Sequence, residues 1–274
     1  MKKRRIIVIS CIIGIIVILV GIFAAMFNLQ HITVEIKKNP EIVLSYGEDV
    51  GDKIIKTGDF PYDSNTLFSS YKDNQEKIEK NFPFVKVEKL VRRFPNKMTI
   101  YVSGRIPEAI VKNKSSYYVL DIDLKILAVI SSVSELDNDM YKGLPIVEGI
   151  DMSGLSSGDF LEKSEGSELV AILDGIYAKD KTKSSVMSRI TINKQDNLYS
   201  IVLRDSNVDG AKIDIKGSEN LKEKVFCAYS LYKFKENDSR YPDKSKMSFY
   251  VGLDFVINTN EKVVMKYDGT EVNV

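Results

Sequence analysis

Tryptophan is absent from this chain, and histidine and cysteine are scarce, with one His and two Cys in 274 residues. A lone histidine, His31, excludes any metal cluster built from several histidines. Cys11 lies inside an apolar run, so Cys227 is the one cysteine of the remaining chain and no internal disulfide can form there. The fold must therefore be held together by its hydrophobic core.

An excess of one charge is also missing. The chain carries 39 Lys and Arg residues against 38 Asp and Glu residues, and four of the cations fall within the first five positions. The rest therefore has 35 cations against 38 anions, a slight acidic excess. Nucleic-acid binding requires a basic patch or stripe, which this balance does not supply.

One long uncharged run, residues 6–27, stands out against this mixed background. About 20 apolar residues are needed to cross a bilayer as a helix, and the apolar part of a cleavable signal peptide is shorter, about 7–15 residues. Basic residues before the run place the N-terminus in the cytoplasm. The sequence predicts a cytoplasmic tail (residues 1–5), a single transmembrane helix and an extracytoplasmic remainder. The predicted membrane-anchor residues are Lys2, Lys3, Arg4, Arg5, Ile6 and Phe27.

The remainder exceeds the usual size of one domain, which favours two. Its first part, up to Pro107, begins with an alternating strand at residues 32–36. Helical spacing follows over residues 65–82 and ends at Pro83, since proline excludes the preceding residue from the α region. Two strands, 85–91 and 98–102, flank a turn at residues 95–97 and predict a hairpin. Between these signals, residues 39–47 are interpreted as an added strand.

The second part is richer in strands, predicted at residues 118–124, 188–192, 199–203 and 212–215. Two helices interrupt them, one over 169–176 with Ser167 as its N-cap and one over 221–232. Alternation from residue 249 to 257, a turn at 258–260 and a run at 263–267 predict two final strands. Such strands often leave a sheet edge open, which is either a liability or a binding site. The predicted fold class is α+β.

Several motifs resemble the FtsQ/DivIB cell-division family. They are the stretch 65–68, the "FPFV" of residues 82–85, the "RRFPNKMTIYV" of residues 92–102, the "RIPEA" of residues 105–109, the "YVLD" of residues 118–121 and the "GLPIVEG" of residues 143–149. Gly104 stands where the family commonly has Glu. The resemblance implies a single membrane span, a POTRA domain (residues 28–107), a C-terminal β domain (residues 108–267) and a short tail (residues 268–274).

The family resemblance also implies a role. It implies a non-enzymatic bitopic scaffold at the division septum, without cofactor or metal, that binds FtsB/DivIC-like and FtsL-like membrane proteins; septal peptidoglycan synthases are a further class of partner. A partner segment would pair with the last strand, so that Val264→Pro should abolish capture while leaving the extracytoplasmic part folded. The implied partner-binding residues are Phe249, Val251, Leu253, Phe255, Val263, Val264, Met265 and Tyr267.

Two alternatives stay open. A membrane-anchored envelope enzyme is suggested by the short motifs Lys56-Thr57-Gly58 and Ser69-x-x-Lys72, but penicillin-binding enzymes carry them in the opposite order. A POTRA-type chaperone or secretion component is the other. Among possible chemical groups, Cys227 is interpreted as a small core residue, and Asp121 and Asp123 as the solvent-facing residues of one strand.

Overall fold

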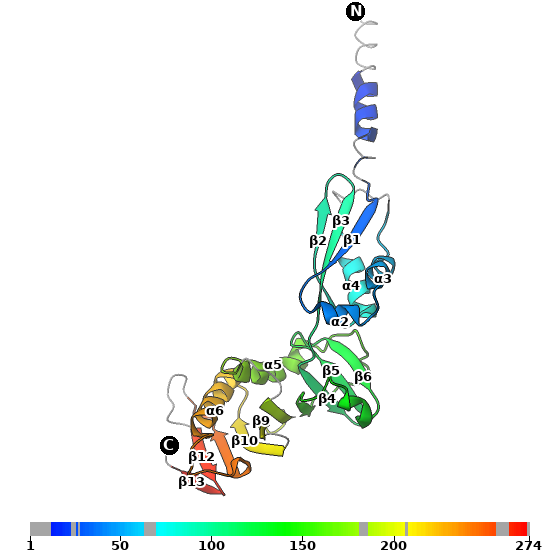
Figure 1. Ribbon diagram of the computed structural model, residues 1–274. Helices are drawn as coiled ribbons and strands as arrows, with labels where there is room; N and C mark the ends of the chain where they lie inside the picture. Colours follow the sequence, from blue (N-terminus) through cyan, green and yellow to red (C-terminus); the bar gives the residue numbers. More distant parts are fainter. Residues whose placement is uncertain are drawn as a thin grey trace, which may run out of the picture. The chain divides into compact units, whose positions relative to one another are not determined.

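The computed structural model describes residues 12–22, 26, 28–62, 70–180, 186–205, 208–255 and 263–272. Contacts divide the chain into two compact units, residues 1–105 and 106–274. Each unit combines a sheet with helices (Figure 1), which confirms the predicted α+β class. The transmembrane part of that prediction is not confirmed: over the described residues no helix has the length and hydropathy that a membrane crossing needs.

Unit 1 is built on a three-stranded sheet in the order β1-β3-β2. The strands are β1 His31–Ile36, β2 Val85–Arg93 and β3 Lys97–Gly104, with β1 parallel and β2 antiparallel to β3. Helices α3 Val50–Gly58 and α4 Lys72–Asn81 pack beside it (Figure 1). Ile54, Ile78 and Ile100 are fully buried in the resulting core. The predicted first strand and hairpin are therefore confirmed. The beginning of the predicted helix, residues 65–69, lies outside the described residues.

The strand predicted at residues 39–47 is wrong, because this segment contains the helix α2, Pro40–Leu44. Pro40 occupies the first helical turn, where a missing N–H costs nothing. Asn39 has a left-handed backbone (φ 48), and its Nδ2 donates to the Gly104 carbonyl over 3.1 Å. A Cβ at Gly104 would lie 2.6 Å from the Asn39 carbonyl oxygen, so glycine lets the helix start pack against the end of β3.

Unit 2 contains a mixed ten-stranded sheet in the order β13-β12-β11-β10-β9-β8-β7-β4-β5-β6. The strands predicted around residues 188–192, 199–203 and 212–215 are confirmed and somewhat longer than expected. The short 3-10 helices are η1 Val133–Asp137 and η3 Lys244–Lys246. The strand bounds are β4 Ala109–Asn113, β5 Ser116–Leu120, β6 Ile126–Ile130, β7 Ile146–Glu148, β8 Met187–Asn193, β9 Leu198–Asp205, β10 Val208–Lys216, β11 Met247–Val251, β12 Val263–Tyr267 and β13 Thr270–Val272.

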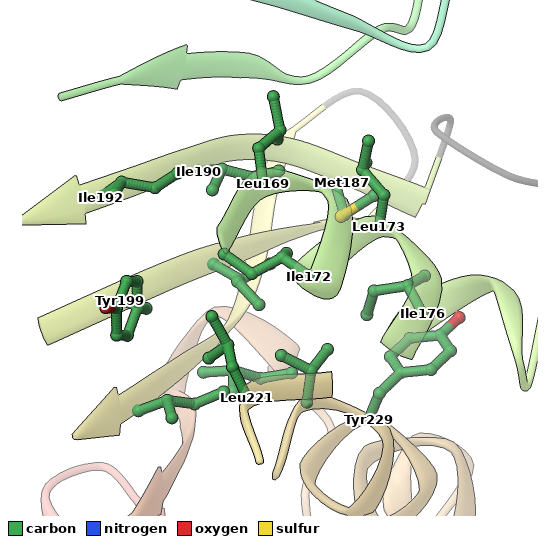
Figure 2. Close-up of a cluster of buried hydrophobic side chains, with 14 of the residues drawn as sticks. Leu169, Ile172, Leu173, Ile176, Met187, Ile190, Ile192, Tyr199, Leu221 and Tyr229 are labelled. Carbon is green, nitrogen blue, oxygen red and sulfur yellow. The ribbon is translucent and has the colours of Figure 1, made fainter. Parts of the chain in front are cut away.

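Two helices of unit 2, α5 Lys163–Tyr177 and α6 Leu221–Lys235, pack on one another and on the sheet. Figure 2 shows Leu169 and Ile172 of α5 in one buried cluster with Ile190 of β8 and Tyr199 of β9. Both helices were predicted. Ser167 as the N-cap of α5 is wrong: Glu162 holds the N-cap position, five residues earlier, and the helix begins at Lys163.

Residues 118–124 form a strand end and a turn instead of one continuous strand. β5 ends at Leu120, Leu124 has a positive φ of 65°, and β6 begins at Ile126. Asp121 Oδ1 accepts a 2.8 Å hydrogen bond from the Lys125 backbone N–H, which closes the turn. Asp121 is thus a buried turn residue rather than a solvent-facing strand residue.

The alternating run that begins at Phe249 is also shorter than predicted. β11 ends at Val251, and residues 252–254 leave the strand before Phe255 returns to the core. Leu253 is 71% exposed, and its Cδ2 would lie 2.6 Å from a Cβ at Gly217, which has a positive φ of 82°. Leu253 therefore lies over Gly217, just past the end of β10, instead of continuing β11. The alternating sequence pattern does not reveal this contact.

Candidate functional site

The candidate site is the C-terminal edge of the large sheet, formed by β11, β12 and β13. β12 pairs antiparallel with β11, with Tyr250 opposite Val264, and β13 pairs antiparallel with β12, with Thr270 opposite Tyr267. The outermost strand on this side is thus β13 and not the predicted terminal strand β12. β13 covers residues 265–267 of β12 and no more in the described chain.

Most side chains predicted to bind a partner face the core instead of solvent. Tyr232 and Phe249 meet edge to face with ring centroids 6.1 Å apart, which fixes β11 to α6. Tyr267 packs against Tyr241 at 5.2 Å and accepts a hydrogen bond from the Asp243 N–H. Of the predicted residues, the structure buries Phe249, Val251, Phe255, Val263 and Met265, half-buries Val264 and Tyr267, and exposes Leu253.

What the edge can offer a partner is therefore its main chain. The Asp268 N–H donates to the Lys246 carbonyl over 3.0 Å, so these two residues form a hydrogen-bonded pair of the β11–β12 ladder. Hydrogen-bonded and non-bonded pairs alternate in an antiparallel ladder, so Tyr250 and Val264 also form a bonded pair. The N–H and C=O groups of Val264 point inward to β11, and those of Val263 point to the opposite side.

The same alternation places the main-chain groups of Glu271 on the outside of β13. Met265 and Tyr267 direct their N–H and C=O groups to β13, where they meet Val272 and Thr270. Glu271, which stands between these two, must then point its N–H and C=O away from β12. Its side chain is exposed and lies opposite Lys266. This outward donor and acceptor form the geometric centre of the candidate site.

Sequence reasoning missed β13, although a local signal was present. Asp268 and Gly269 join β12 to β13 with positive φ values of 51° and 78°. An Asp-Gly pair with both φ values positive is the type I′ turn that favours tight hairpins. The 3.5 Å ion pair between Lys246 and Asp268 stands beside this turn.

Comparison with known proteins tests the FtsQ/DivIB resemblance on the chain as a whole. No protein-family model matches the chain. A curated relative, the cell division protein DivIB of Clostridium botulinum (strain Hall), is 27% identical over 211 residues, which cover 76% of this chain and 73% of that protein. The FtsQ/DivIB resemblance is thereby confirmed. The 211 matched residues extend well beyond residues 65–149, which contain the motifs.

Two charged residues of the "RIPEA" motif, Arg105 and Glu108, are buried. In unit 1, Arg105 Nη2 lies 2.9 Å from Glu79 Oε2, and both side chains are buried. In unit 2, the buried Glu108 accepts a 2.7 Å hydrogen bond from the Tyr177 hydroxyl of α5. The "RIPEA" motif thus places a buried, partnered group in each unit.

The scarce residues His31 and Cys227 belong to different units. His31 is exposed at the start of β1. Cys227 is half-buried on α6, and burial followed by the charge of Glu223 raises the pKa of its thiol, which keeps it protonated. Over the ranges that the structure describes, no three His, Cys, Asp or Glu side chains form a group that could hold a metal ion. The predicted anchor residues Lys2, Lys3, Arg4, Arg5, Ile6 and Phe27 lie outside these ranges.

Proposed function

We propose that this chain is a cell-division protein that acts as a non-enzymatic scaffold, with its N-terminal segment in the membrane. The similarity to DivIB over three quarters of the chain carries the proposal. Its partners are FtsB/DivIC-like and FtsL-like single-span proteins, which it holds together while septal peptidoglycan synthases assemble. Unit 1 corresponds to the POTRA domain of the family, and unit 2 to its β domain.

The partner contact is strand addition at the β12–β13 edge. An extended segment laid along β13 would accept a hydrogen bond from the Glu271 N–H and donate one to its carbonyl, extending the ladder by one strand. Buried side chains on β11 and β12 support this mechanism, because they keep the edge rigid without being needed for contact. Register would come from the alternating side chains of the added segment.

The membrane placement rests on the uncharged run at residues 6–27 and the four cations before it. At residues 12–22 the described part of this run is helical, and its side chains are exposed, as expected of side chains that meet lipid. The two units would then lie outside the cytoplasm. They would be held close to the division septum.

The strand-addition mechanism is tested with Glu271→Pro and its matched control Glu271→Ala in the full chain. Proline removes the outward N–H and is tolerated on an edge whose N–H faces solvent, whereas alanine keeps the main-chain donor. Co-purification with a co-expressed FtsB/DivIC-like partner should be lost with proline and kept with alanine. Equal capture by both variants would show that the partner binds elsewhere.

The broader role in division has its own test. Depletion of the protein from its host should give filaments that lack septa, because assembly of the septal machinery would fail. Normal septation after depletion would contradict a role in division, whatever the result of the strand test.

A further inference from the structure

The tip of the β2–β3 hairpin is tied to the residues that follow the apolar run. The Asn96 carbonyl accepts hydrogen bonds from the N–H groups of Gln30 (2.9 Å) and His31 (3.2 Å). The Asn96 Nδ2 donates to Gln30 Oε1 over 2.7 Å. Leu29 is fully buried in the core of unit 1, so the chain is already fixed at this residue.

This attachment limits how far the tip can lie from the end of the apolar run. Leu29 is two residues beyond Phe27, and two residues span at most about 7 Å when fully extended. β1 then runs parallel to β3 from His31 opposite Lys97, so the hairpin tip and the start of β1 share one end of the sheet. If the apolar run crosses a bilayer, this end of unit 1 lies at the bilayer surface.

The chemistry of the tip fits that position. Phe94 is 65% exposed, and the exposed cations Arg93 and Lys97 flank it in sequence and oppose one another across the hairpin. Arg93 donates to the Tyr101 hydroxyl over 3.1 Å, and over the described part of the chain neither cation forms an ion pair. An aromatic ring between unneutralised cations is suited to an interface where apolar chains meet anionic headgroups.

We propose that this hairpin tip docks onto the anionic lipid surface, with Phe94 in the interface and Arg93 and Lys97 on lipid phosphates. The inference rests on the membrane placement in the proposed function. Docking would add a second attachment beside the apolar run and would restrict the tilt of unit 1 on the bilayer. An acidic protein partner is the competing occupant, and it would leave the tip undocked on pure lipid vesicles.

The natural absence of tryptophan makes a direct test possible, because Phe94→Trp in the full chain gives a single-tryptophan reporter. The chain is reconstituted into phosphatidylglycerol-containing vesicles whose acyl chains carry bromine near the headgroup end. Leu44→Trp is the matched control. Leu44 is 46% exposed on α2, beside the opposite end of β3.

Bromine should quench the tryptophan emission of the Phe94→Trp chain and leave that of the Leu44→Trp chain unchanged. Adding Lys97→Gln to the Phe94→Trp chain should lower the ratio of docked to free tips by roughly fivefold. This is the effect expected from the loss of one cation near an anionic surface. Vesicles made only of phosphatidylcholine should likewise weaken the quenching.

Recovery of the chain with the vesicles after an alkaline wash distinguishes failure of tip docking from failure of the membrane placement. If the Phe94→Trp chain stays and its emission is not quenched, the docking is overturned and the membrane placement stands. If the chain is washed off, both are overturned. Quenching that Lys97→Gln and neutral lipid leave unchanged would overturn the role of the cations.

Discussion

Glu79 and Arg105 form a buried ion pair with 2.9 Å between Oε2 and Nη2. The second oxygen of Glu79, Oε1, accepts hydrogen bonds from the Val87 N–H (2.9 Å) and from Gln75 Nε2 (3.3 Å). Gln75 Nε2 also donates to the Val87 carbonyl over 3.3 Å. α4 therefore satisfies the outward main-chain groups of β2 at Val87, and the edge of the small sheet is closed there.

Glu79→Ala should lower the free energy of unfolding of the full chain by about 3–5 kcal/mol, because it deprives the buried Arg105 guanidinium of this carboxylate. Chemical denaturation monitored by far-UV circular dichroism measures the loss. Lys77→Ala is the control on the same helix, since its 2.9 Å pair with Asp59 is solvent-exposed and should cost less than about 1 kcal/mol. Equal losses would mean that burial does not decide the strength of the pair.

Gly149→Ala should destabilise unit 2 by about 3 kcal/mol or more. Gly149 has a φ of 97°, and an added Cβ would lie only 1.8 Å from the Ile192 carbonyl oxygen of β8. Gly154→Ala separates strain from crowding, because Gly154 also has a positive φ (80°) but no atom within 4 Å of an added Cβ. This control should lose about 1–2 kcal/mol in the same denaturation assay.

Local sequence signals predict the helices and strands well where a turn residue or a regular apolar spacing determines the backbone conformation. The turn at Pro95 and Asn96 fixes the β2–β3 hairpin, and the spacing of Leu169, Ile172 and Ile176 fixes the apolar face of α5. Asn39 and Pro40 could have predicted the start of α2 in the same way. In the sequence their effect is hidden by the apolar residues that follow, which resemble a strand.

The candidate site was less predictable because an edge is a non-local property. The run from Phe249 gives no sign that β11 pairs in parallel with β10, a strand that precedes α6. Nor can alternation tell whether Val264 directs its main chain inward or outward, since that depends on the bonded pairs of the ladder. The Glu79–Arg105 pair joins residues 26 apart and has no local signature either.

Alkaline pH should destabilise unit 2 through two tyrosines of α6. Burial, followed by the charge of Glu236, raises the pKa of Tyr232 to about 12, and burial also raises the pKa of Tyr229, whose hydroxyl donates to Asp180. A raised pKa means that the folded state resists ionisation. The stabilisation that Tyr232 contributes is complete below the unfolded tyrosine pKa of about 10. It is lost as the pH rises from there towards about 12.

The Tyr232 contribution can be isolated with Tyr232→Phe. Between pH 9 and pH 11 the wild-type free energy of unfolding should fall by about 1 kcal/mol more than that of the variant. Parallel pH dependences for wild type and Tyr232→Phe would exclude Tyr232 as a source of the alkaline loss.

Val264→Pro tests the assigned direction of the β12 main chain, and the structure changes what this substitution should do. Because the Val264 N–H points to β11, proline there breaks an internal ladder and should cost about 3 kcal/mol or more. Glu271→Pro, on the outer edge, should cost less than about 1 kcal/mol, since no ladder donor is lost. Thermal unfolding of the two full-length variants compares their stabilities directly.

If Val264→Pro proved as stable as Glu271→Pro, the assignment of bonded pairs would be wrong and the Val264 main chain would face outward. Loss of partner capture in Val264→Pro alone therefore does not identify the binding edge, whereas loss in the stable Glu271→Pro variant does.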